Sequence, residues 1–144
     1  MVHKLAVSQP YSMIVSADIR NTIILWDLNR LKCIREVSPF VIGGDKDIVD
    51  IVINNITGDF TVATTRSLYI FSINGDLLGS VDCMTSLEHR SSMDMISSVA
   101  VSEGPDYFGQ SLIFTGHHSG AFGIWRLGHT RTPAGTIYVI EYAP

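Results

Sequence analysis

The chain has 144 residues, of which 46% are hydrophobic and 17% charged, and its formal net charge is −4. This length suits a single domain with a real core, and the acidic balance excludes the basic footprint of a nucleic-acid-binding or polybasic membrane-binding protein. No apolar run approaches the roughly 18 residues that span a bilayer, and the N-terminus lacks the pattern of a secretory signal.

Short apolar segments follow one another along the chain, either with period two or as continuous β-branched runs, and turn residues bound them. Such segments, rich in Ile, Val, Thr and aromatic residues, predict β-strands. In chain order we expect strands over residues 3–8, 12–17, 22–27 and 32–37, then 48–53, 59–64, 68–73 and 77–82, then 96–102, 111–116, 121–127 and 136–142. The segment with the most helical character, 84–90, is interpreted as a loop.

The third strand of each group of four ends on an aromatic residue: Trp26, Phe71 or Trp125. The intervals are 45 and 54 residues, and insertions at 83–95 and 104–110 lengthen the second. Four strands per unit, a period near 40–45 and a Trp-Asp pair are typical of the WD propeller. We therefore predict an all-β fold of about three four-stranded antiparallel WD-type blades in an incomplete ring. The blades are expected over 1–40, 41–90 and 91–144, the third with its insertions and truncated.

Asn74-Gly75 lies between two apolar segments and is the strongest short hairpin signal in the chain. It predicts a type I′ turn, in which both central residues have positive φ.

The two cysteines, Cys33 and Cys83, lack the spacing of a zinc site or of a redox CxxC pair. We expect both to be small buried hydrophobes in a reducing compartment rather than a disulfide.

Several short sequence motifs follow one another in a recognisable order along the chain. The first unit contains LAVS at 5–8, IVS at 14–16 and WDLN at 26–29; the second contains TGD at 57–59 and LYIFSING at 68–75. The third contains VAVSEG at 99–104, LIFTGH at 112–117 and IWR at 124–126. In this order the segments resemble the C-terminal WD repeats of BEACH-domain proteins of the beige and neurobeachin type.

The resemblance implies a non-enzymatic protein–protein interaction scaffold, part of the C-terminal WD propeller that follows the BEACH domain. Such proteins are very large, cytosolic or membrane-associated, and are implicated in vesicle traffic, lysosome-related organelles or autophagy. It also implies a cytoplasmic location, peripheral on endomembranes through the parent protein, and further blades of the same propeller N-terminal to Met1. The alternative is a generic WD-repeat adaptor subunit of another multiprotein complex.

Strong repeats of this family carry a buried network of His, Asp, Ser or Thr, and Trp. Here Val2 takes the first-strand valine position, so the Gly-His pair of the first blade would precede Met1. Arg20 and Ser119 stand where the Asp is expected, and Phe71 replaces the Trp of the second blade. An incomplete polar network is costly when buried. We therefore expect these positions to be partly exposed or satisfied by other partners.

Two groups of residues are singled out. Structural blade positions are Trp26, Asp27, Phe71, Asn74, Gly75, Gly116, His117 and Trp125. Candidate partner contacts lie on the turns 18–21, 65–67 and 117–120 and on the two insertions, because propellers bind through loops on a rigid frame. The residues chosen on these turns are Asp18, Arg20, Asn21, Arg66, His118 and Ser119.

Catalytic and metal chemistry find little support. His117 and His118 are adjacent, but a metal site needs three or four ligands and no others lie at ligand spacing. No serine sits in a Gly-x-Ser-x-Gly elbow, and packing explains the three aromatics better than base stacking does. We therefore predict no enzyme, no catalytic residues, no cofactor, no metal and no nucleic-acid partner. Because propellers need four to eight blades, three should leave two apolar faces uncovered.

Overall fold

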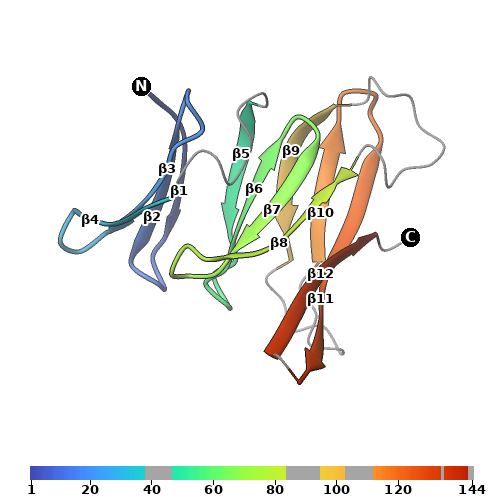
Figure 1. Ribbon diagram of the computed structural model, residues 1–144. Helices are drawn as coiled ribbons and strands as arrows, with labels where there is room; N and C mark the ends of the chain where they lie inside the picture. Colours follow the sequence, from blue (N-terminus) through green and yellow to red (C-terminus); the bar gives the residue numbers. More distant parts are fainter. Residues whose placement is uncertain (38–46, 84–94, 103–111, 134, 143–144) are drawn as a thin grey trace.

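The computed structural model describes residues 1–37, 47–83, 95–102, 112–133 and 135–142, and within them twelve strands form three four-stranded antiparallel sheets (Figure 1). The first sheet contains β1 (Val2–Ser8), β2 (Met13–Asp18), β3 (Ile23–Asp27) and β4 (Lys32–Val37). The second contains β5 (Ile48–Ile53), β6 (Phe60–Thr64), β7 (Ser67–Phe71) and β8 (Leu77–Asp82). The third contains β9 (Ile96–Val101), β10 (Leu112–His117), β11 (Phe122–Thr132) and β12 (Gly135–Tyr142).

The strands pair in chain order within each sheet, as the blades of a propeller do. The predicted all-β fold of four-stranded blades is confirmed, with small shifts at strand ends and a β11 that continues to Thr132. The proposed blade boundaries after residues 40 and 90 lie outside the described residues. So do the segment 84–90 and nearly all of both insertions.

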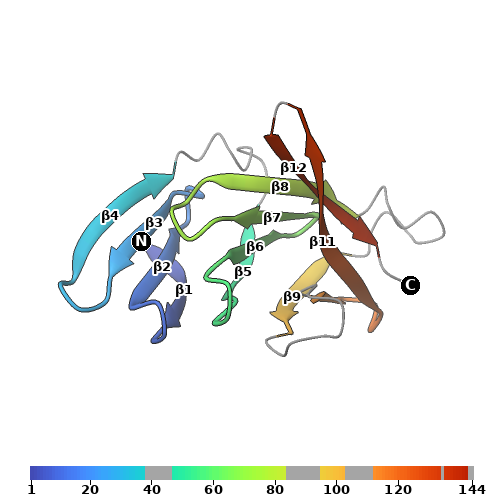
Figure 2. The same cartoon turned by 90° about the horizontal axis from the view of Figure 1, so that it is seen from below.

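The three sheets stand side by side like an open fan (Figure 2). Their first strands, β1, β5 and β9, are neighbours along one side of the fan, and β4, β8 and β12 lie along the other. The fan therefore has an inner edge made by first strands and an outer edge made by fourth strands.

Alternation of side chains along each strand gives every sheet two faces. We name as the front face the side that carries the aromatic residue at the end of the third strand, and as the back face the opposite side. Val15 and Leu25 on the back face of the first sheet belong to one core with Phe60 and Phe71 on the front face of the second. Packing between these sheets is therefore front to back.

The next pair of sheets repeats this arrangement. Leu68 and Ile70 on the back face of the second sheet share a core with Ile113 and Trp125 on the front face of the third. Trp125 and Phe71 are both fully buried, so the expectation that these aromatics pack between blades is confirmed for the second and third sheets.

The turn between β7 and β8 differs from the sequence prediction. Gly75 has a φ of 88°, whereas Asn74 is not among the residues with positive φ, so the turn is not type I′. The amide of Gly75 donates to the carbonyl of Ser72 at 2.9 Å, and the strand register slips next to Phe71. These features describe a longer loop with a glycine bulge. The prediction placed the hairpin correctly and gave its type wrongly, because it ignored the extra residue that the bulge absorbs.

Of the two cysteines predicted to be buried, Cys83 is fully buried and Cys33 is exposed. The prediction is therefore correct for Cys83 and wrong for Cys33. Cys33 lies on β4, the outer edge strand of the first sheet, where five of six residues are exposed. An edge strand leaves its side chains in contact with water unless another element covers them.

Candidate interaction surface at the rim

The turns that join the second strand to the third of each sheet lie at the same end of the fan, at the top of Figure 1. They comprise residues 18–22, 64–67 and 117–121. We call this end, with these three turns, the upper rim. All six residues predicted to contact a partner are on it.

In the first turn, the carboxylate of Asp18 holds the backbone in place. Its Oδ1 accepts hydrogen bonds from the amides of Arg20 at 2.8 Å and Thr22 at 3.0 Å. The bond from Thr22 is the main cause that lowers the pKa of Asp18 below 3.8, with partial burial acting against it. Asn21 follows in the left-handed conformation, with a φ of 63°, which Asn tolerates better than most residues. The turn is thus fixed by its own side chain.

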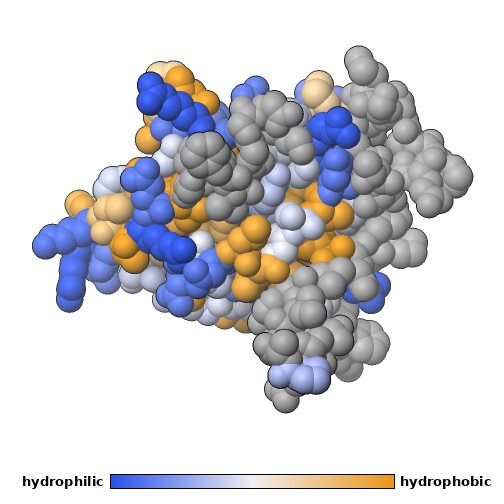
Figure 3. Space-filling view, viewed as in Figure 1, coloured by the Kyte–Doolittle hydropathy of each residue, from blue (hydrophilic) through white to orange (hydrophobic). Residues whose placement is uncertain are grey.

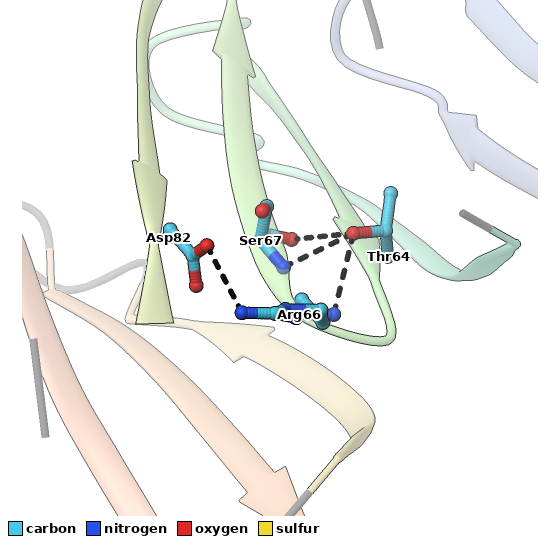
Figure 4. Close-up of polar contacts among 4 residues, drawn as sticks. All are labelled: Thr64, Arg66, Ser67 and Asp82. Carbon is cyan, nitrogen blue, oxygen red and sulfur yellow. Dashed lines mark hydrogen bonds and ion pairs between the residues drawn. The ribbon is translucent and has the colours of Figure 1, made fainter. Parts of the chain in front are cut away.

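In the second turn, Thr64 plays the part that Asp18 plays in the first (Figure 4). Its Oγ1 accepts from the amides of Ser67 at 3.0 Å and Arg66 at 3.4 Å, and donates to the carbonyl of Ser67 at 3.4 Å. Arg66 extends toward Asp82 at the end of β8, with 3.5 Å between Nη2 and Oδ2. This exposed ion pair adds little to stability.

Backbone hydrogen bonds anchor the second turn to its neighbours. The carbonyl of Thr65 accepts from the amide of Ile96 at 2.9 Å, and the carbonyl of Arg66 accepts from the amide of Cys83 at 2.9 Å. In the third turn the amide of His118 donates to the carbonyl of Met95 at 3.0 Å. The bond between Thr65 and Ile96 joins the second and third sheets at the upper rim, and the other two bonds fix their turns within a sheet.

In the third turn, the two adjacent histidines point to different environments. His117 is only 5% exposed, and its Nε2 lies 3.0 Å from Oγ1 of Thr115. His118 is exposed at the start of the turn that Gly120 completes with a φ of 84°. As predicted, His117 ends a strand and His118 enters the hairpin. Among the described residues no group of three His, Cys, Asp or Glu side chains could hold a metal ion.

Exposure separates the six candidate contact residues. Arg20, Arg66, His118 and Ser119 are exposed, and Asp18 is partly buried. Asn21 is only 5% exposed, so it offers a partner almost no surface, and its left-handed backbone accounts for its place in the turn. We therefore keep the four exposed residues as the contact candidates and assign Asn21 to the frame.

In the first and third sheets, the indole N–H of the tryptophan has a hydrogen-bond partner although no Asp completes the family's polar network. The indole nitrogen of Trp26 donates to Ser16 at 2.9 Å, and that of Trp125 donates to Thr115 at 3.0 Å. In the third sheet His117 completes a buried chain with Thr115. Arg20 and Ser119, in the positions expected for Asp, are exposed. The expectation of exposed positions therefore holds for Arg20 and Ser119 but not for Phe71, which is fully buried and packs as an apolar side chain.

The remaining structural positions have local roles. The carboxylate of Asp27 accepts from the amides of Asn29 at 2.9 Å and Arg30 at 3.2 Å, which fixes the turn after β3. Phe71 stacks on Phe60, with ring centroids 5.1 Å apart. At Gly116 a Cβ would lie 2.7 Å from Oγ of Ser98 on β9, so a larger residue would displace that hydroxyl.

Two hydrogen bonds between inner strands of neighbouring sheets were not predicted from the sequence. Nε2 of His3 on β1 lies 2.9 Å from the carbonyl of Ile48 on β5. Oδ2 of Asp50 on β5 accepts from the amide of Val99 on β9 at 3.0 Å. Each polar residue lies at or next to a register shift, His3 between Val2 and Lys4 and Asp50 directly after Val49. A polar residue within a mainly apolar strand was the available signal in the sequence.

The fold has close counterparts among solved WD40 domains. The crystal structure of the WD40 domain of SCAP from fission yeast matches 99% of this chain and 31% of that chain, with a TM-score of 0.70 and 16% identity. The complex of the fission yeast SREBP–SCAP binding domains matches 97% of this chain and 36% of that chain, with a TM-score of 0.67 and 15% identity. The three sheets are therefore blades of a WD-type β-propeller.

Sequence relatives then specify the group of proteins. BEACH domain-containing protein A2 and Protein SPIRRIG, both of Arabidopsis thaliana, are each 38% identical over 129 residues, which is 90% of this chain. The human lysosomal-trafficking regulator is 27% identical over 86% of the chain. No family model matches. These relatives confirm the resemblance to the WD repeats of BEACH-domain proteins.

The chain spans only 3% of the length of each of these three relatives. Among the residues that the structure describes, no helix is long and apolar enough to cross a membrane.

Proposed function

We propose that this chain is a non-enzymatic protein-interaction scaffold and forms part of the C-terminal WD propeller of a BEACH-type protein. Its role would be in vesicle traffic, lysosome-related organelles or autophagy, with a cytoplasmic location peripheral on endomembranes. Further blades of a longer polypeptide would continue the ring. The identity to BEACH domain-containing protein A2 over 90% of the chain supports this assignment.

The observation that carries the scaffold role is the rigid upper rim. Side-chain and backbone hydrogen bonds fix the turns, while Arg20, Arg66, His118 and Ser119 remain exposed on them. A preformed surface of this kind binds with little backbone movement. Arginine is favoured in such contacts because its fork donates several hydrogen bonds at once.

The alternative, a WD-repeat adaptor in another complex, also has an observation behind it. One structural neighbour is a complex of SREBP and SCAP binding domains, so a WD40 domain of this shape occurs in a binding assembly outside the BEACH group. The identity of the captured proteins distinguishes the two roles.

The test compares affinity purifications of the chain and of two charge-reversal variants. Arg20→Glu/Arg66→Glu changes the upper rim. Arg30→Glu/Lys32→Glu is the matched control away from the rim, on exposed residues of the β3–β4 turn and the start of β4. We expect the rim variant to lose a defined set of membrane-traffic proteins that the control retains. Equal capture by all three proteins would contradict the rim assignment, and a set drawn from an unrelated complex would favour the adaptor.

A further inference from the structure

A small cavity of about 30 Å³ lies between the back face of the second sheet and the front face of the third. Its walls are mainly apolar and come from both sheets: Ile70, Val101, Ile113 and Leu127. In the space-filling view, apolar surface also appears over the middle of the molecule, where these two sheets lie (Figure 3). Three polar residues of the second sheet and its β5–β6 turn nevertheless line the cavity: Asn54, Asp59 and Thr61.

Thr61 brings a hydroxyl group into this apolar interface. It follows Phe60 on β6, and because Phe60 stacks on Phe71 at the front face, Thr61 points to the back face, toward the third sheet. Thr61 is only 4% exposed. Among the hydrogen bonds of the described residues, none involves its hydroxyl. A buried hydroxyl without a partner is unfavourable, so Thr61 needs a hydrogen-bonding group from outside the chain.

Asp59 lies two residues before Thr61 and therefore on the same side of the sheet. Its side chain is partly buried, and burial raises the pKa of its carboxyl group above 3.8. Asn54 closes the lining from the start of the β5–β6 turn, where its Oδ1 accepts from the amides of Ile56 at 2.9 Å and Thr57 at 3.3 Å. The polar side chains thus gather at one end of the cavity, on the side of the second sheet.

The first sheet has apolar residues at the matching places. The strand pairs that end on the aromatic residue put Met13 and Val15 of β2 where Asp59 and Thr61 stand in the second sheet. Met13 is 2% exposed and Val15 0%, and both belong to the core between the first and second sheets. Packing at this place is therefore apolar in one interface, whereas in the next interface a carboxyl and a hydroxyl group line a cavity.

We propose that this cavity is a binding site for one ordered water molecule, held by the hydroxyl of Thr61 and the carboxyl of Asp59. The cavity exceeds the roughly 10–15 Å³ that a water molecule needs, and a buried water needs two to four polar partners. Pockets for organic ligands measure roughly 300–1,000 Å³, so the site excludes them. The second and third sheets would then pack through a bound water. This inference does not rest on the proposed function.

Crystal structures of the wild-type protein and of two variants test the site. Thr61→Val keeps the shape of the side chain without the hydroxyl, and Thr61→Ser keeps the hydroxyl. The wild type should show a water about 2.5–3.0 Å from Oγ1 of Thr61, the usual length of a hydrogen bond between two oxygens. The water should remain in Thr61→Ser and be lost in Thr61→Val.

Nuclear magnetic resonance gives a second readout in solution. Cross-peaks between water and the methyl groups of Val101 and Ile113 should appear in the wild type and in Thr61→Ser, and should vanish in Thr61→Val. Unchanged methyl signals of Val15 and Leu25, in the other interface, would show that the variants stay folded. A wild-type cavity without water in the crystal and without these cross-peaks overturns the proposal. So does a Thr61→Val protein that holds the same water as the wild type.

Discussion

The indole nitrogen of Trp125 donates a hydrogen bond of 3.0 Å to Oγ1 of Thr115, and both residues are almost completely buried between the second and third sheets. The matching bond in the first sheet, from Trp26 to Ser16, has a similar length of 2.9 Å. These two residues, however, line an apolar groove that is open to solvent. The same contact therefore occurs once in a dry setting and once next to water.

Thr115→Val removes the acceptor with little change of shape. It should lower the free energy of unfolding by about 1–3 kcal/mol, because Trp125 and His117 both lose their hydrogen bond to a buried hydroxyl. Urea denaturation followed by tryptophan fluorescence measures the change. Ser16→Ala is the control, and we expect a smaller loss because water can reach Trp26. Equal losses from the two substitutions would show that the burial difference does not govern the bond.

Gly123→Ala should destabilise the same contact by steric pressure. Gly123 pairs with Thr115 across the strands, and an added Cβ would lie 2.8 Å from Oγ1 of Thr115 and 2.9 Å from Nε1 of Trp125. Overpacking of this kind costs roughly 1–3 kcal/mol, which the thermal midpoint would record. Gly120→Asn is the control, since its site is open and Asn tolerates the φ of 84°. A larger loss in the control would contradict the steric explanation.

The strands and the inter-sheet aromatics were predictable because they depend on local pattern. Alternating apolar residues define a strand with two faces, and the spacing of Trp26, Phe71 and Trp125 revealed the repeat. The polar turns were predictable for the same reason, since Asp18 and Gly120 stabilise local backbone conformations.

The predictions that were wrong concern the exposure of side chains, which depends on neighbours in the folded structure. Cys33 is exposed because β4 is an edge strand, and periodicity does not tell an edge strand from a central one. Asn21 looked like a surface residue, yet its left-handed turn directs it inward to 5% exposure. An uncovered face on the first blade could be anticipated from the number of blades. The groove that Trp26 lines on this face could not be anticipated, and neither could the left-handed backbone of Leu31 at its edge.

Thiol reactivity should separate the two cysteines. Burial raises the pKa of the Cys83 thiol to about 12, with the Asp82 carboxylate adding to the effect, whereas Cys33 is exposed. At mildly alkaline pH, iodoacetamide should modify Cys33 and leave Cys83 intact in the folded chain, because the thiolate is the reactive form. Peptide mass spectrometry identifies the modified site, and unfolding in urea should expose both. Rapid modification of folded Cys83 would contradict its burial.

The same pKa shift predicts a loss of stability in alkali. A folded pKa raised above the usual 9.0 favours the neutral thiol in the folded state. This contribution is complete below pH 9.0 and declines as the pH rises toward about 12. Cys83→Ala should flatten the alkaline limb of the stability curve, although the smaller side chain lowers stability at every pH. A Cys33→Ala chain should keep the alkaline slope of the wild type.

In acid, Asp18 and Asp59 should act in opposite directions. The amide of Thr22 lowers the pKa of Asp18, so its contribution to stability is present above pH 3.8 and is lost as the pH falls through its folded pKa. Burial raises the pKa of Asp59, so its contribution is present below pH 3.8 and is lost as the pH rises through its folded pKa. Variants of each residue, unfolded in urea at neutral pH and below pH 3.8, measure the contribution of each carboxyl group to stability.

Asp18→Ala should therefore lower stability at neutral pH by about 1 kcal/mol, the usual net value of lost hydrogen bonds, and should have less effect in acid. Asp59→Asn should instead raise stability at neutral pH relative to acid, because it removes a carboxylate that burial disfavours. Asp18→Asn is the matched control for the first change, since it keeps an oxygen acceptor for Arg20 and Thr22 without the charge. If Asp18→Ala destabilised the chain equally at both pH values, the two hydrogen bonds would not depend on ionisation of Asp18.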